Sequence, residues 1–422
     1  MTAVRIVWVF AAALAAAGVR PAAAESAPAK PRPAVPAAPV KGLALHEWGV
    51  FSVFDDAGTA GAAMREEWKG LPEFVHGRLD GRTVPVERQP TSVRKPVIHL
   101  HGELGGQVMQ LRVDLPGGRP LVWWPGHSNR HLEGTPDPQQ TFLTWRFRIG
   151  DLDRTATAVS EEGIPAGHWM AKLRAVKAAD LYCEDISERG GKRLGFAGRH
   201  YVKERFLYYD GVVPAPKGVR ATVAADGSVG LTGAKDFDAA DVLVIDRRGA
   251  RLRLARFAEI KAGAAVARAE LADADADAEA ARLTRSLTAA GLNPDEAGSV
   301  TAIWKKDFFE APGLTLVYRI PQSVYDRMLP LTVEPRPETI VRVGLVHHVV
   351  DGDPALSAKI AAIIKEFDAE DFDTREAATK QLAELGRAAV PHLIRLRAGK
   401  LSAEARSRIS GVLDRYLVSE NR

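Results

Sequence analysis

The stretch Leu45-His46-Glu47-Trp48-Gly49-Val50-Phe51-Ser52-Val53-Phe54 decides the fold class, because aromatic and β-branched residues favour strands. It ends at the turn-like Asp55-Asp56-Ala57-Gly58. Short runs of the same type, separated by Gly, Pro and Asp, continue to about residue 350: Lys95–His101, Met109–Leu115, Phe142–Ile149, Arg199–Tyr209, Val219–Leu231, Asp241–Ile245, Leu252–Ile260, Leu314–Ile320 and Ile340–Val350. We therefore predict an α+β fold whose β-rich body, residues 43–350, is an antiparallel sandwich-like structure of one or two subdomains.

Two helices interrupt the predicted strands. The first covers Asp277–Ala290 and ends at Gly291, a favourable C-terminal cap. The second begins after the cap residue Asn293, with Pro294 at its first position. Its inner face carries Ala297, Thr301, Trp304 and Phe308.

Residues 351–422 follow a helical period instead. Ile360, Ile363, Ile364 and Phe367 lie at i, i+3, i+4 and i+7. Three further amphipathic stretches follow, around residues 373–386, 390–394 and 409–416. Four short helices make two antiparallel pairs of an α-solenoid, fewer than the three or so repeats that usually stand alone. We expect this all-α unit to dock on the body or on a protein partner.

The first 42 residues carry export signals. Arg5, the apolar run Ile6–Ala17 and the small residues Ala22-Ala23-Ala24 predict a signal peptide over residues 1–24. Residues 25–42 are rich in Pro and Ala and predict an extended linker. No later run is apolar for long enough to span a bilayer. We therefore expect an exported protein, periplasmic or extracellular, without a transmembrane segment in the mature chain.

Charge and cysteine content exclude some classes of function. The formal net charge is +4, and removing Arg5 and Arg20 with the signal peptide leaves 4 − 2 = +2. Nucleic-acid binding is not predicted, because it needs clustered positive charge. The one cysteine, Cys183, excludes an internal disulfide and is expected to be buried.

The chain resembles two known groups of proteins. The segment Asp371–Pro391 resembles HEAT-like repeats, with its charged start, its Leu385-Gly386 stop and its Ala389-Val390-Pro391 restart. The body resembles a family of exported bacterial proteins that open with His-Glu-Trp-Gly-Thr-Phe, which here reads His46-Glu47-Trp48-Gly49-Val50-Phe51. Further matching pieces include Leu71–His76, Val113–Gly118, Phe206–Gly211 and Leu329–Val333. The resemblances imply export, a contact scaffold in the tail and a fold for the body, but no catalytic mechanism.

Histidines supply the clearest candidate chemistry, since six of the 11 lie between His46 and His131. His99 and His101 are two apart on a predicted strand and therefore share one face, an arrangement used in zinc sites. His127 and His131 are four apart, and Glu103 or Glu133 could add an oxygen ligand. The alternative is that these histidines are ordinary surface or core-edge residues.

A polar pocket and an aromatic platform are two further candidate sites. His46 and Glu47 are adjacent on a strand, so they point to opposite faces, and Glu47 could line a pocket with Trp48 and His76. The structural alternative is hydrogen bonding that holds the first strand. Trp123 and Trp124 could stack on sugar rings, although tryptophans at a strand end usually belong to a core.

These observations favour a non-catalytic exported protein. Its body would bind a surface, a carbohydrate or an extracellular partner, and its helical tail would mediate a protein contact, with no cofactor predicted. The alternative is a metal-dependent hydrolytic enzyme that uses zinc, with His99, His101 and a third ligand from His127, His131 or Glu103.

Overall fold

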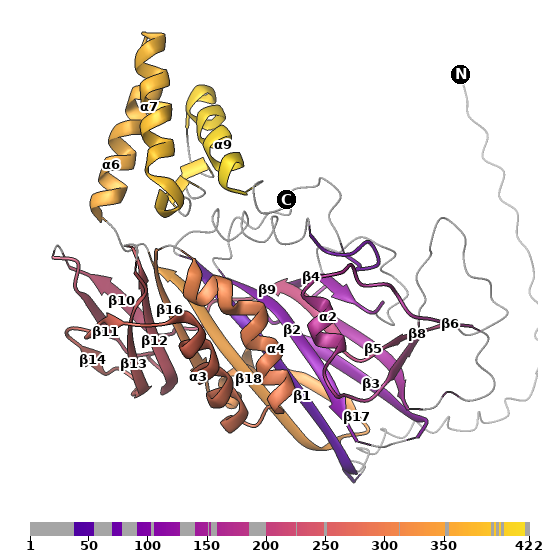
Figure 1. The fold of residues 1–422 in the computed structure, drawn as a ribbon. Helices are drawn as coiled ribbons and strands as arrows, with labels where there is room; N and C mark the ends of the chain where they lie inside the picture. Colours follow the sequence, from indigo (N-terminus) through magenta and orange to yellow (C-terminus); the bar gives the residue numbers. More distant parts are fainter. Residues whose placement is uncertain are drawn as a thin grey trace, which may run out of the picture. The chain divides into compact units, whose positions relative to one another are not determined.

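The computed structural model describes 15 stretches of the chain, and the structural statements below concern these residues alone. They are 38–54, 70–77, 91–102, 105–126, 140–150, 152, 158–184, 200–224, 226–248, 251–311, 313–350, 354–389, 392–393, 396–397 and 401–417. The fold is α+β with a β-rich body, as predicted (Figure 1).

A nine-stranded sheet runs through the whole body. Its order is β15 (Ala272–Asp273), β13 (Arg253–Ile260), β12 (Ala239–Arg247), β16 (Gly313–Ile320), β18 (Pro337–Val350), β1 (Val40–Phe54), β2 (Thr91–His101), β9 (Leu207–Val212) and β4 (Arg119–Trp124). Strands from both ends of the body are thus neighbours at the centre of one sheet. β1 begins at Val40, so the last three residues of the predicted linker, 40–42, belong to a strand.

Strand pairing is mostly antiparallel, as predicted, but the central pair β1–β18 is parallel. The β1–β2 pairing is irregular between Trp48 and Val50. A side chain at the intervening Gly49 would lie 2.9 Å from the Tyr325 hydroxyl and 3.2 Å from the Pro96 Cα. The position therefore accepts only glycine without movement of its neighbours.

Two smaller sheets complete the strand structure. One has the order β17 (Leu331–Glu334), β3 (Gln107–Asp114), β5 (Phe142–Ile149), β7 (Leu181–Glu184), β8 (His200–Glu204) and β6 (Ala158–Ser160). The other has the order β10 (Arg220–Val223), β11 (Val229–Thr232) and β14 (Ala265–Val266). The predicted strand Arg199–Tyr209 is therefore two strands, and Val219–Leu231 is a hairpin with Gly227 at positive φ in its turn.

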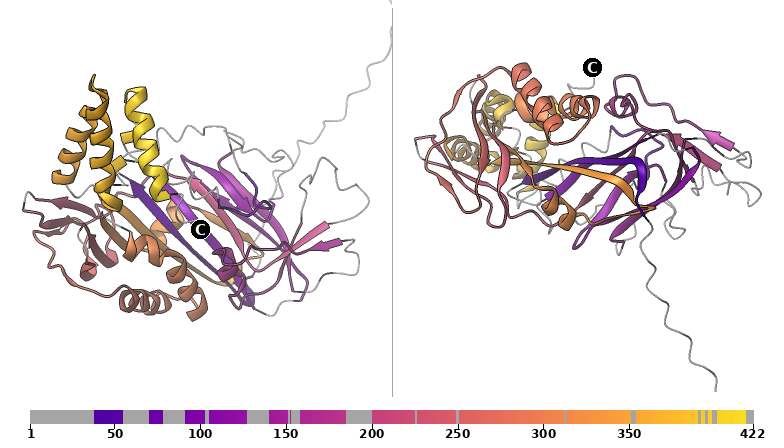
Figure 2. Two further views of the ribbon diagram at one scale, coloured as in Figure 1. Left: turned by 45° about the horizontal axis from the view of Figure 1, so that its top comes forward. Right: turned by 90° about the horizontal axis from the view of Figure 1, so that it is seen from below.

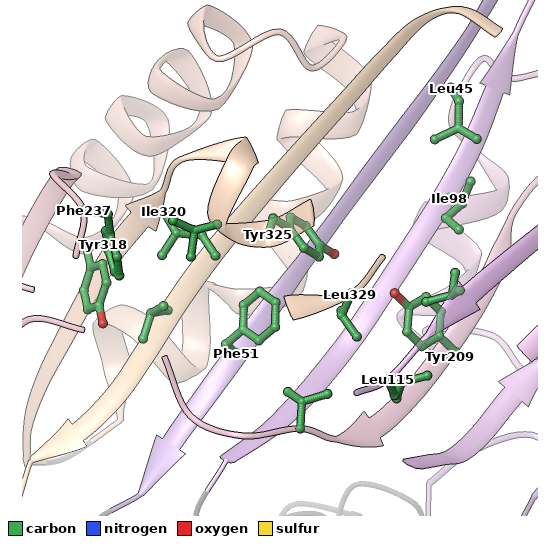
Figure 3. Close-up of a cluster of buried hydrophobic side chains, with 14 of the residues drawn as sticks. Leu45, Phe51, Ile98, Leu115, Tyr209, Phe237, Tyr318, Ile320, Tyr325 and Leu329 are labelled. Carbon is green, nitrogen blue, oxygen red and sulfur yellow. The ribbon is translucent and has the colours of Figure 1, made fainter. Parts of the chain in front are cut away.

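One face of the large sheet packs against the six-stranded sheet. Leu45 of β1 and Ile98 of β2 share a core with Leu111 of β3, Trp145 of β5 and Cys183 of β7, which is buried as expected. The cluster continues to Tyr318 of β16 and to Tyr325 of α5 (Gln322–Met328) (Figure 3). We call this side of the large sheet the sheet face.

Helices cover the opposite side, which we call the helix face. They are α2 (Met170–Arg174), α3 (Ala276–Ala289) and α4 (Pro294–Lys305), and α4 continues into a π-helical turn, η1 (Lys306–Glu310) (Figure 2). Leu283, Leu287 and Trp304 of these helices share a core with Trp48 and Val97 of the sheet. Because strand residues alternate between faces, odd and even positions of β1 enter different cores.

The tail has a core of its own. Its helices are α6 (Pro354–Lys365), η2 (Glu366–Asp368), α7 (Phe372–Glu384), η3 (Gly386–Ala389) and α9 (Ala403–Leu417). Ile360, Phe367, Leu382, Leu393 and Ile409 are fully buried within it. Val390 and Ile394 of the predicted third helix lie outside the described residues, and the HEAT-like assignment stays a prediction. No helix among the described residues is long and apolar enough to cross a membrane.

Candidate metal centre

Strand register brings three histidines together on the helix face. His46 of β1 lies opposite His99 of β2, and Ala44 lies opposite His101. Residues paired across antiparallel strands share a face, and His99 and His101 are two apart, so all three imidazoles emerge on the same side. The rings of His46 and His101 have centroids 4.6 Å apart. The predicted common face of His99 and His101 is thus confirmed.

Helix α4 delivers a carboxylate to these histidines. Asn293 and Glu296 form a capping box at its N-terminus, in which the Asn293 backbone N–H donates to Glu296 Oε2 at 2.8 Å. The same carboxylate lies 2.7 Å from His46 Nδ1 through Oε2 and 3.0 Å from His101 Nε2 through Oε1. His99 Nδ1 is 3.5 Å from Oε1. We call His46, His99, His101 and Glu296 the His₃Glu cluster.

Backbone carbonyls hold the outward side of two imidazoles. His99 Nε2 lies 3.3 Å from the Leu173 carbonyl at the end of α2, and His101 Nδ1 lies 3.2 Å from the Lys177 carbonyl. A carbonyl only accepts, so the facing ring nitrogen carries the proton. In neutral imidazoles the inward nitrogen then presents a lone pair. Buried His99 Nδ1 has no hydrogen-bond partner among the described residues.

The cluster is nearly closed to solvent. The side chains of His99 and Glu296 are 0% exposed, that of His46 is 9% exposed and that of His101 is 16% exposed. Within the cluster, the exposed side-chain surface therefore belongs to His46 and His101.

The electrostatics of the cluster are dominated by burial and by the carboxylate. Burial lowers the pKa of His99 to about 4, against the opposing charge of Glu296. Burial also lowers the pKa of His101, but the hydrogen bond and charge of Glu296 outweigh it, so the net pKa is raised. Burial raises the pKa of Glu296, but hydrogen bonds from His101 and His46 outweigh it and leave the net pKa well below its ordinary value. The carboxylate is therefore ionised at neutral pH.

The predicted third metal ligands are not part of this description. His127, His131, Glu103 and Glu133 lie outside the described residues. The structure instead supplies His46, which the sequence placed in a different candidate pocket, and Glu296, which the sequence did not single out. A glutamate at the third position of a capped helix is the one sequence signal that marked Glu296.

The predicted pocket of His46, Glu47, Trp48 and His76 does not form, because strand alternation separates its members. On the sheet face, Glu47 accepts hydrogen bonds from Arg342 Nε at 2.6 Å and from the Tyr209 hydroxyl at 2.7 Å. Trp48 is buried on the helix face. The ring of His76 stacks on Trp124, with centroids 5.8 Å apart. Glu47 therefore fixes the first strand through hydrogen bonds, as the structural alternative predicts.

Trp123 and Trp124 do not form the predicted aromatic platform, because both side chains are buried. Trp123 is 1% exposed and Trp124 is 0% exposed. Being consecutive on β4, they point into different cores, Trp123 on the sheet face and Trp124 on the helix face. Trp124 Nε1 donates to Glu204 at 3.0 Å. Two rings on opposite faces offer no shared surface for a sugar.

Comparison with known proteins adds no family to this geometry. No family model matches the chain, and no curated protein matches its sequence. Among solved structures, the yeast delta-COP-I mu-homology domain in complex with a Dsl1 WxWxV peptide aligns at a TM-score of 0.23 with 8% identity, covering 73% of this chain and 96% of that one. The same yeast domain without the peptide aligns with the same values. A TM-score of 0.23 does not support an inference about function.

Proposed function

We propose that this protein binds one divalent transition-metal ion, zinc in the first instance, through His46, His101 and Glu296, with the neighbouring His99 as the fourth ligand. The observation that supports it is the convergence of three imidazoles on one buried carboxylate, with the outward N–H groups of His99 and His101 held by backbone carbonyls. Metal-binding histidines characteristically have such carbonyl partners, which orient the ring and leave the inward nitrogen free to bind.

The spacing of the ligand atoms suits a tetrahedral ion. Zinc–nitrogen bonds of about 2.0–2.1 Å separate neighbouring ligand atoms by about 3.3 Å in a tetrahedron. The three nitrogen-to-oxygen distances here are 2.7, 3.0 and 3.5 Å. The ligand atoms of His46, His101 and Glu296 all lie within 4.8 Å of one another, so these three could hold the ion, whereas His99 lies outside this set and would have to move inward to bind it. Imidazole with one carboxylate suits zinc, and copper(II) competes for the same donors.

A metal ion also satisfies the polar atoms of His99, His101 and Glu296 better than added protons do. His101 faces two acceptors, the Lys177 carbonyl and the Glu296 carboxylate. Direct bonds to both require a charged imidazolium. His99 turns an unpartnered Nδ1 towards the same carboxylate. A metal ion binds both inward nitrogens as lone pairs and neutralises the buried carboxylate.

Whether the site only holds the ion or also activates a water depends on His99. With His99 as a fourth ligand the protein would fill a tetrahedral shell, as in structural zinc sites, whereas His46, His101 and Glu296 alone would keep a position open for water, as in hydrolytic sites. A bound ion would join β1, β2 and α4, which are far apart in the chain. The proposal therefore retains a non-catalytic role and adds a metal to it.

The test is the metal content of the full chain, purified without a histidine tag and incubated with zinc. We expect about one equivalent in the wild type and none in His101→Ala. His348→Ala is the matched control, because His348 of β18 lies outside the cluster, and it should retain the metal. Absence of zinc from the wild type, or equal zinc in His101→Ala, would refute the proposal.

His99→Ala separates the closed site from a hydrolytic one. In a closed site this variant loses affinity together with the fourth ligand. Undiminished affinity would show three ligands and an open position, and would restore the enzyme hypothesis.

We further propose that the tail contacts a protein partner. Phe372 at the start of α7 is 60% exposed, and the Arg375 guanidinium lies 5.7 Å from its ring centroid. Exposed aromatic and arginine side chains are characteristic of binding hot spots. Immobilised wild-type chain should capture a partner from extract of its own cell envelope, and Phe372→Ser and a chain lacking 351–422 should not. Equal capture by all three would refute the role of the tail.

A further inference from the structure

A second polar group lies on the helix face, at the C-terminal end of α4. Trp304 stacks on Phe308 of η1, with centroids 5.5 Å apart and an interplanar angle of 17°. The Arg94 guanidinium carbon and the Lys95 Nζ each lie 4.7 Å from the Trp304 ring centroid. Two consecutive cations of β2 therefore contact one buried indole.

A strand irregularity makes this arrangement possible. Consecutive strand residues normally point to opposite faces. Lys95 has a φ of 49°, and the pairing of β2 shifts register here with both of its neighbours, β1 and β9. The Lys95 N–H donates to Asp210 Oδ1 at 2.5 Å. Such bulges re-aim a side chain, and here the bulge places Arg94 and Lys95 on the same indole.

Buried polar atoms at this place have no partner among the described residues. They are both ring nitrogens of His347 on β18 and Trp304 Nε1. His347 is 5% exposed and Trp304 is 0% exposed. The His347 ring centroid is 6.3 Å from that of Trp304 and 5.2 Å from that of Phe308. Unmatched buried donors cost free energy, and a bound group that accepts hydrogen bonds would remove this cost.

The buried atoms of His347 and Trp304 that have no partner are mostly hydrogen-bond donors. Burial lowers the pKa of His347 to about 4, so the ring is neutral at pH 7 and offers one N–H. Trp304 adds a second N–H. Arg94 and Lys95, which have partners of their own, bring positive charge to the same indole. Two carboxylates face these cations: the buried Asp210, and Asp307, which is 41% exposed and lies 3.6 Å from Arg94, a long contact that an anion could replace.

We propose that Arg94, Lys95, Trp304 and His347 form a binding site for a small oxyanion, a carboxylate or phosphate group. The ligand accepts hydrogen bonds from the Trp304 and His347 N–H groups and takes the place of Asp307 beside Arg94. Trp304 lies eight residues after Glu296 on α4 and its extension, about 12 Å along the helix axis. The oxyanion site is therefore separate from the His₃Glu cluster and does not depend on the metal.

The experiment is calorimetric titration of the full chain at pH 7 and constant ionic strength, with sodium acetate in one arm and sodium phosphate in the other. We expect one-site saturable binding of at least one anion. Trp304→Phe keeps the ring and removes the N–H, and should raise the Kd by about tenfold, as expected for a lost hydrogen bond to a charged group. Arg94→Gln should also weaken binding.

Trp145→Phe is the matched control. It makes the same change on the sheet face, where Trp145 Nε1 donates to the Pro125 carbonyl at 2.9 Å. This variant should bind the anion as the wild type does, and so should Glu296→Gln. If neither anion binds saturably, the proposal is wrong. A buried water would then be the partner of the Trp304 and His347 nitrogens. Unchanged affinity in both Trp304→Phe and Arg94→Gln would overturn it equally.

Discussion

His46 Nδ1 lies 2.7 Å from Glu296 Oε2, although the two residues are 250 positions apart in the chain. One belongs to the central strand β1 and the other to the first turn of α4. The contact therefore ties the helix layer to the sheet. A metal at this place would act on the stability of the body as a whole.

Glu296→Gln should weaken zinc binding at least tenfold, because it replaces the anionic ligand by a neutral amide of the same size. Glutamine also serves at the third position of a capping box, so α4 should persist. Zinc affinity is measured by competition with a chromophoric chelator, and circular dichroism is the control for helix content. An affinity equal to that of the wild type would contradict the assignment of Glu296 as a ligand.

Zinc should raise the thermal unfolding midpoint of the wild type. A ligand at 100 times its Kd adds about 2.7 kcal/mol to the free energy of unfolding, which corresponds to a shift of several degrees in a protein of this size. Differential scanning calorimetry with zinc and with chelator measures the shift. His101→Ala should show none, and His348→Ala should respond as the wild type does.

The metal-free protein should gain stability from Glu296 within a limited pH window. The pKa of the folded carboxyl is depressed, so its contribution is present above the unfolded value of about 4.3 and is lost as pH falls. The pKa of folded His101 is raised, so its contribution is full below about 6.5 and is lost as pH rises through the folded value. The difference in unfolding free energy between wild type and Glu296→Gln should therefore be largest between about pH 4.5 and 6.5.

Urea unfolding in the presence of chelator at a series of pH values measures this difference. A flat profile from pH 4 to 8 would contradict the pairing of Glu296 with His101.

Arg342→Met should destabilise the body by about 3–5 kcal/mol, because the buried Glu47 charge loses its cation, whereas Glu47→Gln should cost less, because Arg342 Nη1 also donates to Asp326 at 2.8 Å. The two side chains are 0% and 1% exposed, and Arg342 Nε donates to Glu47 at 2.6 Å. Glu47→Gln and Arg342→Met are compared by urea unfolding. The double variant should recover part of the loss, and additive losses would show that the two residues are not coupled.

Local sequence patterns predicted a large part of the fold. Alternation along a strand was sufficient to place His46 and Glu47 on opposite faces, and His99 and His101 on the same face. The cap at Asn293 and Pro294 marked the start of α4, and the helical period located the tail. These features depend on neighbours within a few residues, so the sequence by itself determined them.

The tertiary structure alone decided which distant residues meet. Proximity in the chain suggested His127, His131 or Glu103 as the third ligand, whereas packing of α4 on the sheet brought Glu296 to His46. The parallel pairing of β1 with β18 likewise joins segments almost 300 residues apart. Such contacts follow from burying apolar faces and satisfying buried polar groups across the whole molecule, which no local pattern encodes.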